Sequence, residues 1–253
     1  MNDTLRTIHS LHTTHGNFQP DRRLEPEILE TILAATVRAA SASAMQTYSI
    51  IVMEDAQRQR EVCGYAASAT LLFCVDYTRL VDSAARLGHS FEVGGIVGFV
   101  TGAVNTLLAA QTTVIAARAL GVDSLVTNGI HRVDLQETYR RLNLPVAHCF
   151  PLIAICLGYA IAAPEAAKGR LCGPGVIHRG AYQRATPEQL DAIIAAHDKQ
   201  GIGVTADWRA GGLQHYLDWF FTKWARPVAP AKIAEFDALL TRAGFLTAPG
   251  ASA

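Results

Sequence analysis

A run of 25 residues without a charge, VGGIVGFVTGAVNTLLAAQTTVIAA from Val93 to Ala117, limits what this chain can fold into. By length alone the run would span a bilayer. However, Asn105, Gln111 and several threonines recur through it, no Lys/Arg cluster flanks it, and no second such segment follows. We therefore expect no membrane span but a central helix that is buried on nearly all sides, within the domain or between subunits.

The balance of charge excludes some classes of partner. Lys+Arg and Asp+Glu are 22 each in 253 residues, so the chain has no basic field with which to bind nucleic acid or an anionic membrane. Half of the residues are hydrophobic and only 17% are charged. Because so little polar surface is available, we expect a buried self-association surface.

The cysteines indicate the compartment. They are five in number, none is part of a C-x-x-C motif, and most lie in apolar runs such as LLFCVDY and LIAICLGY. This pattern predicts buried free thiols in a reducing compartment. The first residues, MNDTLRTIHS, have neither an apolar core nor an Arg/Ser-rich amphipathic pattern, so we expect a cytoplasmic protein with no targeting segment.

Helical and strand patterns alternate along the chain, which predicts an α+β domain. Strands are expected in YSIIVMED, TLLFCVDY, GVDSLVTNGI and FPLIAICLGYA. Helices are expected at about 3–11, from Pro26 to near Ala39, over 133–142, and from a capping box at Thr186 to about Lys199. Two further helical stretches, LQHYLDWFFTKW and PAKIAEFDALLTRAGF, complete a C-terminal arm. We expect one domain, 1–253, with a core at 1–185 and a helical excursion at 186–253.

Three histidines in TIHSLHTTHGNF raise the question of a metal site. His9, His12 and His15 are three residues apart, so on a helix their directions spread over about 200° and they cannot converge on one ion. Zinc motifs on helices use pairs at i, i+4. Two other interpretations remain open: a polar helix end that runs into a turn, and an anion-binding loop in which His12, Thr13 and Thr14 donate hydrogen bonds.

A second candidate lies in RAASASAMQTYSI, between a helix and a strand. The small residues around Ser41 and Ser43 let backbone amides approach a ligand, and the hydroxyl groups can donate to it. Tight packing of the helix on the sheet explains the same composition.

Two further candidates are loops. Thr127, Asn128 and Gly129 follow a strand and can direct backbone N–H groups at the edge of a heterocycle, or simply form a turn. Lys168 and Arg170 lie in a Gly-rich loop and can close over an anion, or form a solvated surface pair. No nucleophile elbow, zinc-protease motif, Walker loop or dinucleotide fingerprint is present, so we predict no catalytic acid, base or nucleophile and no metal site.

Taken in order, these segments resemble the flavin-dependent nitroreductase family, in its NADPH-linked branch of nitroreductases and flavin reductases. The family's H-R-S-x-R-x-F motif stands here as HTTHGNF, and its S-S-x-x-x-Q turn as SASAMQ, which adds Gln46. The strand FPLIAICLGYA is similar to the family's F-P-x-x-x-x-C-L-G-[WY] and is the most specific match. The loop PEAAKGRLCGPGVIHRGAYQ resembles the branch's K-P-R-L-P loop.

The resemblance implies a nitroreductase-like fold, with a mixed or antiparallel sheet flanked by helices, in an intertwined homodimer whose core contains the long uncharged helix. It also implies one FMN at each of two sites built from both chains. The cofactor phosphate would lie near His12, Thr13, Thr14, Lys168 and Arg170, and its ring near Ser41, Ser43, Gln46, Thr127, Asn128 and Gly129.

The chain also departs from the family pattern. The two arginines of the first motif fall on Thr13 and Gly16, and the arginine of the later loop on His131. In the C-terminal arm, where the branch carries basic residues for NADPH, the segment GVTADWRAGG offers only Arg209. We therefore weigh three functions: hydride transfer from NAD(P)H through FMN to a nitroaromatic, quinone or flavin; a degenerate member that binds a flavin or another aromatic ligand without turnover; and a flavoenzyme with no nicotinamide partner.

Overall fold

The computed structural model describes residues 1–162, 169–199 and 208–247. The contacts divide the chain into two compact units, Met1–Pro164 with Ala231–Ala253, and Glu165–Pro230. Each unit is described by itself below. The expected organisation as one domain remains a prediction.

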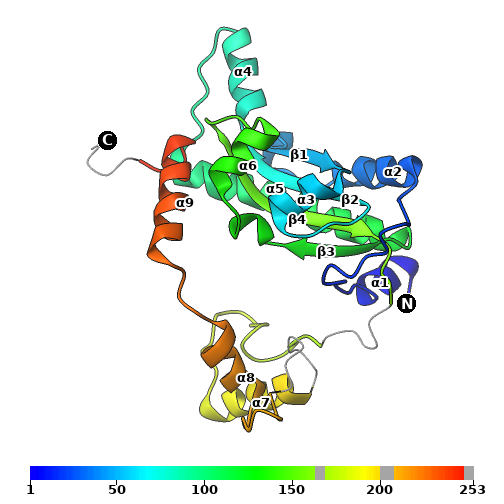
Figure 1. Ribbon diagram of the computed structural model, residues 1–253. Coiled ribbons are helices and arrows are strands. Elements are labelled where there is room, and N and C mark those ends of the chain that lie inside the picture. The colour runs from blue at the N-terminus through cyan, green and yellow to red at the C-terminus, as the bar shows by residue number, and fades with distance from the viewer. Residues whose placement is uncertain (163–168, 200–207, 248–253) are drawn as a thin grey trace. The chain divides into compact units, whose positions relative to one another are not determined.

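The first unit is built on a four-stranded antiparallel sheet in the order β1-β2-β4-β3 (Figure 1). The strands are β1 (Tyr48–Met53), β2 (Ala69–Asp76), β3 (Asp123–Thr127) and β4 (Cys149–Gly158). β2 and β4 form the centre of the sheet, and seven of the eight residues of β2 are buried. All four strands were predicted from their apolar runs, and their arrangement confirms the expected α+β class.

The helices of the first unit are α1 (Asp3–His9), α2 (Pro26–Thr36), α3 (Ala56–Cys63), α4 (Thr78–Arg86), α5 (Gly95–Ala119), α6 (Leu135–Leu142) and α9 (Pro230–Arg242). Two cores lie on the two faces of β2. Leu71 and Phe73 are buried with residues of α2 and α5. Leu72 and Cys74 are buried with residues of α3, α6 and α9. This alternation follows from the two-residue period of a strand.

Two helices were not predicted from the sequence. α3 is mostly polar and therefore lacks an apolar period, but it is well capped: the Asp55 side chain accepts a hydrogen bond from the Arg58 amide at 2.8 Å, and Gly64 ends it with φ +81°. α4 has no buried residue. Two predicted helices were also too long, since α1 ends at His9 and not Leu11, and α2 ends at Thr36 and not Ala39.

The long uncharged run forms α5, but this helix is not buried all round. Its buried residues lie on one face, together with Asn105, Thr106 and Thr113. The opposite face carries a strip of exposed apolar side chains, which are Ile96, Val97, Val100, Val104, Leu107 and Leu108. At 100° per residue this strip fills an arc of about 120°. Among the residues that the structure describes, α5 is the one helix long and apolar enough to cross a membrane, a test that core helices of soluble proteins also pass.

The second unit contains α7 (Pro187–Lys199), α8 (Tyr216–Trp219) and one π-helical turn, Phe220–Trp224. The predicted capping box opens α7: Thr186 N–H donates to Gln189 Oε1 at 3.0 Å, and Gln189 N–H donates to Thr186 Oγ1 at 3.3 Å. The expectation that the cysteines are buried is correct for four of the five and wrong for Cys172, which is exposed.

Candidate functional site

The loop that follows α1 lies against the ends of β3 and β4. The amide of Thr14 donates to the Ser124 carbonyl of β3 at 3.2 Å. Further along, the Gln19 amide donates to Tyr159 O at 2.8 Å, and the Gln19 side chain donates to Ala160 O at 2.7 Å. The histidine-rich segment is therefore an ordered loop and not a frayed helix end.

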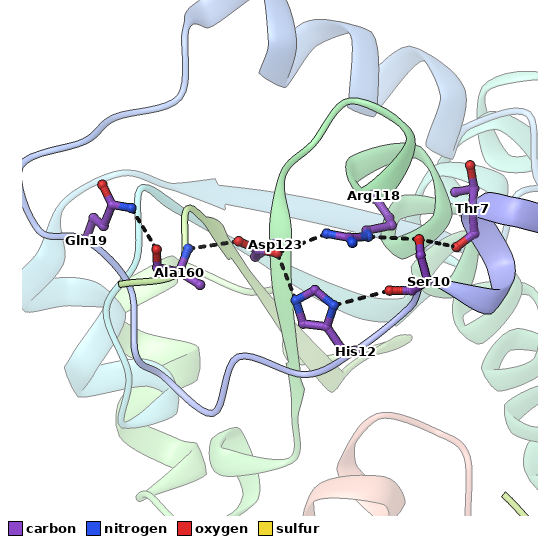
Figure 2. Close-up of polar contacts among 7 residues, drawn as sticks. All are labelled: Thr7, Ser10, His12, Gln19, Arg118, Asp123 and Ala160. Atoms are coloured by element: carbon purple, nitrogen blue, oxygen red, sulfur yellow. Dashed lines mark hydrogen bonds and ion pairs between the residues drawn. The ribbon is translucent and has the colours of Figure 1, made fainter. Parts of the chain in front are cut away.

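A charged cluster ties this loop to β3 and α5 (Figure 2). His12 Nε2 lies 3.0 Å from Asp123 Oδ1, and both side chains are largely buried. Arg118 Nη1 lies 3.3 Å from the same oxygen, and Arg118 Nε donates to Ser10 Oγ at 3.0 Å. The other carboxylate oxygen accepts from the Ala160 amide at 2.9 Å. Asp123 Oδ1 thus lies within ion-pair distance of both His12 and Arg118, although the contact with His12 Nε2 lacks hydrogen-bond geometry.

The two threonines of this loop differ in environment. Thr13 is exposed, whereas Thr14 is buried. The hydroxyl of Thr14 has no hydrogen-bond partner within the described part of the chain. An unpaired buried hydroxyl costs about 1–3 kcal/mol, so a ligand that accepted a hydrogen bond from this atom would remove that cost. Next to it, His15 and Gly16 adopt left-handed conformations with φ of 49° and 78°.

The turn between α2 and β1 carries the second set of predicted residues. Ser43, Ala44 and Gln46 all have positive φ, at 49°, 55° and 47°. Each such non-glycine conformation costs roughly 1–3 kcal/mol, and strain of this kind clusters at functional sites. Ser41 Oγ accepts from the Gln46 amide at 2.7 Å and closes the turn.

Asn105 of α5 fixes this turn from beneath. Its side-chain oxygen accepts from the Ala42 amide at 3.0 Å, and its Nδ2 donates to Thr47 Oγ1 at 2.7 Å. Both Asn105 and Thr47 are fully buried. The polar residue inside the apolar helix therefore has a structural purpose, since it positions the Ser41–Gln46 turn.

The loop after β3 is tightly packed. Gly129 N–H donates to Thr127 Oγ1 at 2.9 Å, and a Cβ on Gly129 would collide with the Cys63 carbonyl. Asn128 is exposed. His131 turns inward, with Nε2 3.2 Å from Pro151 O and its ring against Phe236. Burial lowers the pKa of His131, so at neutral pH it is an uncharged packing residue where the family has an arginine.

The remaining predicted pair is Lys168 and Arg170. Arg170 belongs to the second unit, is exposed and donates to Gly169 O at 2.9 Å. Lys168 lies outside the described residues. The structure therefore does not test whether this pair closes over the first loop.

Within one chain, the strand register places the residues predicted near the phosphate far from those predicted near the ring. Tyr48, which follows the Ser41–Gln46 turn, pairs with Val75, and Val75 pairs with Phe150 at the start of β4. Asp123, beside His12, pairs with Gly158 at the end of β4. Eight residues at about 3.3 Å each place these two sets roughly 25 Å apart, at opposite ends of the sheet.

Three positioning residues were not predicted from the sequence. They are Asp123, Arg118 and Asn105, the last in its contact with the Ser41–Gln46 turn. A signal existed for the last, because an asparagine in a long apolar helix has to find partners. Arg118 and Asp123 are five residues apart, on either side of the end of α5. Nothing in the sequence indicates that they lie beside His12.

The chain matches the model of the nitroreductase family over residues 12–159, which is more than half of its length. This match defines the class of the protein as a flavin-linked oxidoreductase. The protein belongs to the nitroreductase family.

Individual relatives agree with this assignment. The FMN reductase [NAD(P)H] of Bacillus subtilis is 29% identical over 213 residues, 79% of this chain and 82% of that protein. The structure of B. megaterium NfrA2 superposes with a TM-score of 0.83 at 23% identity, over 97% of this chain and 99% of that one. A nitroreductase with bound FMN from Desulfitobacterium hafniense has a TM-score of 0.54 at 17% identity, over 71% of this chain and 98% of that one. The structures support the nitroreductase fold.

Proposed function

We propose that the protein is an FMN-dependent oxidoreductase that takes hydride from NAD(P)H and passes it to a nitroaromatic, a quinone or a flavin. Family membership and the name of the Bacillus subtilis relative support the class. The observation that carries the proposal is the buried Thr14 hydroxyl in the loop that matches the family's first motif. This donor has no hydrogen-bond partner among the residues that the structure describes.

In this proposal Thr14 donates to the cofactor phosphate, with His12, Thr13, Lys168 and Arg170 around it. The Asp123 carboxylate, which lies 3.0 Å from His12, keeps the imidazole in place beside the loop. When bound, FMN supplies the hydride chemistry itself, so the protein needs no nucleophile or catalytic acid. The chain's residues bind the cofactor, orient it and exclude water.

The ring contacts come from a second chain in this account. Ser41, Ser43 and Gln46 lie at the end of the sheet away from Thr14, roughly 25 Å along β4 by the rise of a strand. One flavin ring cannot reach both ends. A homodimer in which the turn of one protomer meets the first loop of its partner resolves this separation.

The apolar strip of α5 is the surface that we assign to this homodimer. Its six aliphatic side chains are 43–71% exposed in the single chain. Exposed apolar strips of this kind mark association surfaces. Because Asn105, which holds the Ser41–Gln46 turn, lies on the buried face of the same helix, dimerisation through α5 would also fix the ring-binding turn.

A second function is favoured by one observation. Tyr65 occupies the space beside Gly16, where the family has an arginine, and Thr13 stands at the other arginine position. With two positive charges absent, the chain could bind flavin or another aromatic ligand without nicotinamide-linked turnover.

We place the protein in the cytoplasm, in agreement with its five free cysteines.

Replacing Thr14 with valine tests the proposal. Valine keeps the shape and removes the donor, so FMN affinity should fall about tenfold or more, the value of one hydrogen bond to a charged group. The FMN-free protein should become no less stable, and up to about 1 kcal/mol more stable, because an unpaired buried hydroxyl is lost. Thr31→Val, an exposed threonine of α2, is the matched control.

FMN titration by flavin fluorescence and urea unfolding of the FMN-free protein give the two readouts. Weaker binding with undiminished stability supports a ligand donor at Thr14. Equal FMN affinity in Thr14→Val and Thr31→Val would remove Thr14 from the site. For the dimer, Val97→Glu combined with Val104→Glu should give a monomer by light scattering, while Leu87→Glu, exposed outside α5, should not.

A further inference from the structure

Two cysteines face each other inside the core, between α3 and the central strand β4. Cys63 is the last residue of α3, Cys156 belongs to β4, and their Sγ atoms are 3.9 Å apart. Cys63 is 1% exposed and Cys156 is fully buried. The two sulfur atoms are therefore in contact, and neither belongs to the FMN contacts that we assign above.

The two thiols are held in a short chain of hydrogen bonds. Thr70 Oγ1 of β2 donates to Cys156 Sγ at 3.5 Å, and Cys63 Sγ donates to the Gln59 carbonyl at 3.3 Å. The hydrogen bond between the sulfur atoms lowers the pKa of Cys63, in spite of burial. The same contact, together with burial, raises the pKa of Cys156. Cys63 is thus the thiol that ionises more readily, and the thiolate is the form that reacts with oxidants.

A simpler role for the pair is packing, because a free cysteine behaves as a small apolar side chain in a core. Packing explains why both thiols are buried. It does not require their sulfur atoms to touch, nor a lowered pKa for one of them. Cys74 shows the contrast, since its contact with Cys149 and its burial raise its pKa and keep it protonated.

A small oxidant can approach Cys63 from the end of α3. Gly64 and Tyr65, the next two residues, line a pocket of about 310 Å³. Gly64 ends the helix with φ +81°, and helix ends open locally more readily than the middle of a helix. The pocket brings solvent close to Cys63, so a local opening of this helix end is enough to expose its Sγ.

We propose that Cys63 and Cys156 form a thiol oxidation site, which a hydroperoxide converts into a disulfide bond. In the first step Cys63 Sγ attacks the peroxide, the O–O bond breaks, and Cys63 becomes a sulfenic acid while water or an alcohol leaves. In the second step Cys156 Sγ attacks Cys63 Sγ, the S–O bond breaks, and water leaves with the proton of Cys156. The two thiols lose two electrons, which the peroxide gains.

Closure of this bond acts on the loop after β3. A disulfide bond of about 2.0 Å requires the two sulfur atoms to move together by roughly half of their present separation. A Cβ on Gly129 would lie 2.1 Å from the Cys63 carbonyl oxygen, so the backbones of Cys63 and Gly129 are in contact. A shift of Cys63 toward β4 therefore changes the support of loop 127–131.

Mass spectrometry of protein treated with hydrogen peroxide tests the site. Cys172→Ser removes the exposed thiol and leaves four cysteines as the parent protein. We expect the parent mass to fall by about 2 Da, two of the four thiols to become unreactive toward maleimide in denaturant, and a peptide that links Cys63 to Cys156. Cys74→Ala is the matched control, because it removes another buried thiol of the same core and should still form the link.

Cys63→Ala and Cys156→Ala should each abolish the link. Amide hydrogen exchange of segment 127–131 should change about threefold or more on oxidation of the parent and of Cys74→Ala, and stay unchanged in Cys63→Ala. The peptide map of the parent identifies the linked pair without any core variant.

Three outcomes would overturn the proposal. They are a parent protein without the link, a link between Cys74 and Cys149 in its place, and a link between Cys63 and Cys156 that leaves the exchange of 127–131 unchanged. None of these measurements requires bound FMN. A protein that takes up no flavin would therefore contradict the proposed function and leave this test intact.

Discussion

The ring of Tyr65 packs so closely over Gly16 that position 16 has no room for a side chain while the ring stays in place. A Cβ on Gly16 would lie 2.6 Å from Tyr65 Cδ1 and 3.1 Å from Cε1, and Gly16 has φ +78°. The tyrosine therefore occupies the space that a side chain at position 16 would need. Because the ring fills this space, the glycine leaves no cavity there.

Restoring the arginine should be costly unless the ring is removed. We expect Gly16→Arg to lose about 2–4 kcal/mol of unfolding free energy, from the left-handed backbone and overpacking against Tyr65. In Gly16→Arg with Tyr65→Ala the overpacking should disappear. Urea unfolding of the four proteins in a double-mutant cycle should give a favourable coupling of about 1 kcal/mol or more. Strictly additive losses would mean that the two residues do not share this space.

Asn105 should matter for both stability and cofactor. Asn105→Leu removes the partners of the Ala42 amide and the Thr47 hydroxyl, so we expect a loss of about 2–4 kcal/mol. The Ser41–Gln46 turn should loosen, and FMN affinity should fall in parallel. Gln111→Ala, an exposed position of the same helix, should stay within about 0.5 kcal/mol in thermal unfolding. Normal FMN binding in a folded Asn105→Leu protein would separate the turn from the cofactor.

Much of the fold could be predicted because apolar runs in the sequence mark the strands. All four strands and the long helix coincide with apolar runs of the sequence. α3 was missed because its identity comes from its caps, Asp55 and Gly64, around a polar sequence. The exposure of one face of α5 could not be predicted, since the same apolar residues suit a face packed on the core and a face packed on a partner chain.

The candidate site was harder to predict, since it depends on contacts between distant segments. The motif order indicates which loops matter, but not that His12 lies beside Asp123, 111 positions away. Nor does the order show that the first loop and the Ser41–Gln46 turn lie at opposite ends of one sheet, which follows only from the register of β2 with β4.

The junction of α7 and α8 should depend on pH. His215 Nδ1 lies 2.7 Å from Asp198 Oδ2, and this bond raises the pKa of His215. Partial burial opposes ionisation of Asp198, but the bonds from His215 and the Tyr216 amide prevail and lower its pKa. A raised histidine pKa stabilises the junction below about pH 6.5, and the contribution is lost as pH rises through the folded value. The lowered aspartate pKa stabilises it above about pH 3.9, and that contribution is lost as pH falls further.

The junction should therefore be most stable between about pH 4 and 6.5. NMR titration of the His215 ring should show a lower pKa in Asp198→Asn than in the wild type. Asp191→Asn, which removes a carboxylate that acts on His215 only through space, should have a smaller effect. The same His215 pKa in wild type and Asp198→Asn would contradict the pairing.

The central claim, that this chain is an FMN-dependent NAD(P)H oxidoreductase, is tested most directly by the absorption spectrum of the purified protein under anaerobic conditions. We predict one FMN per chain, with its visible absorption bleached on addition of NADH or NADPH and restored by a quinone or nitroaromatic. Stoichiometric FMN that neither nicotinamide reduces would favour the degenerate member or a flavoenzyme with another reductant. Protein that is colourless and takes up no FMN on titration would contradict the account.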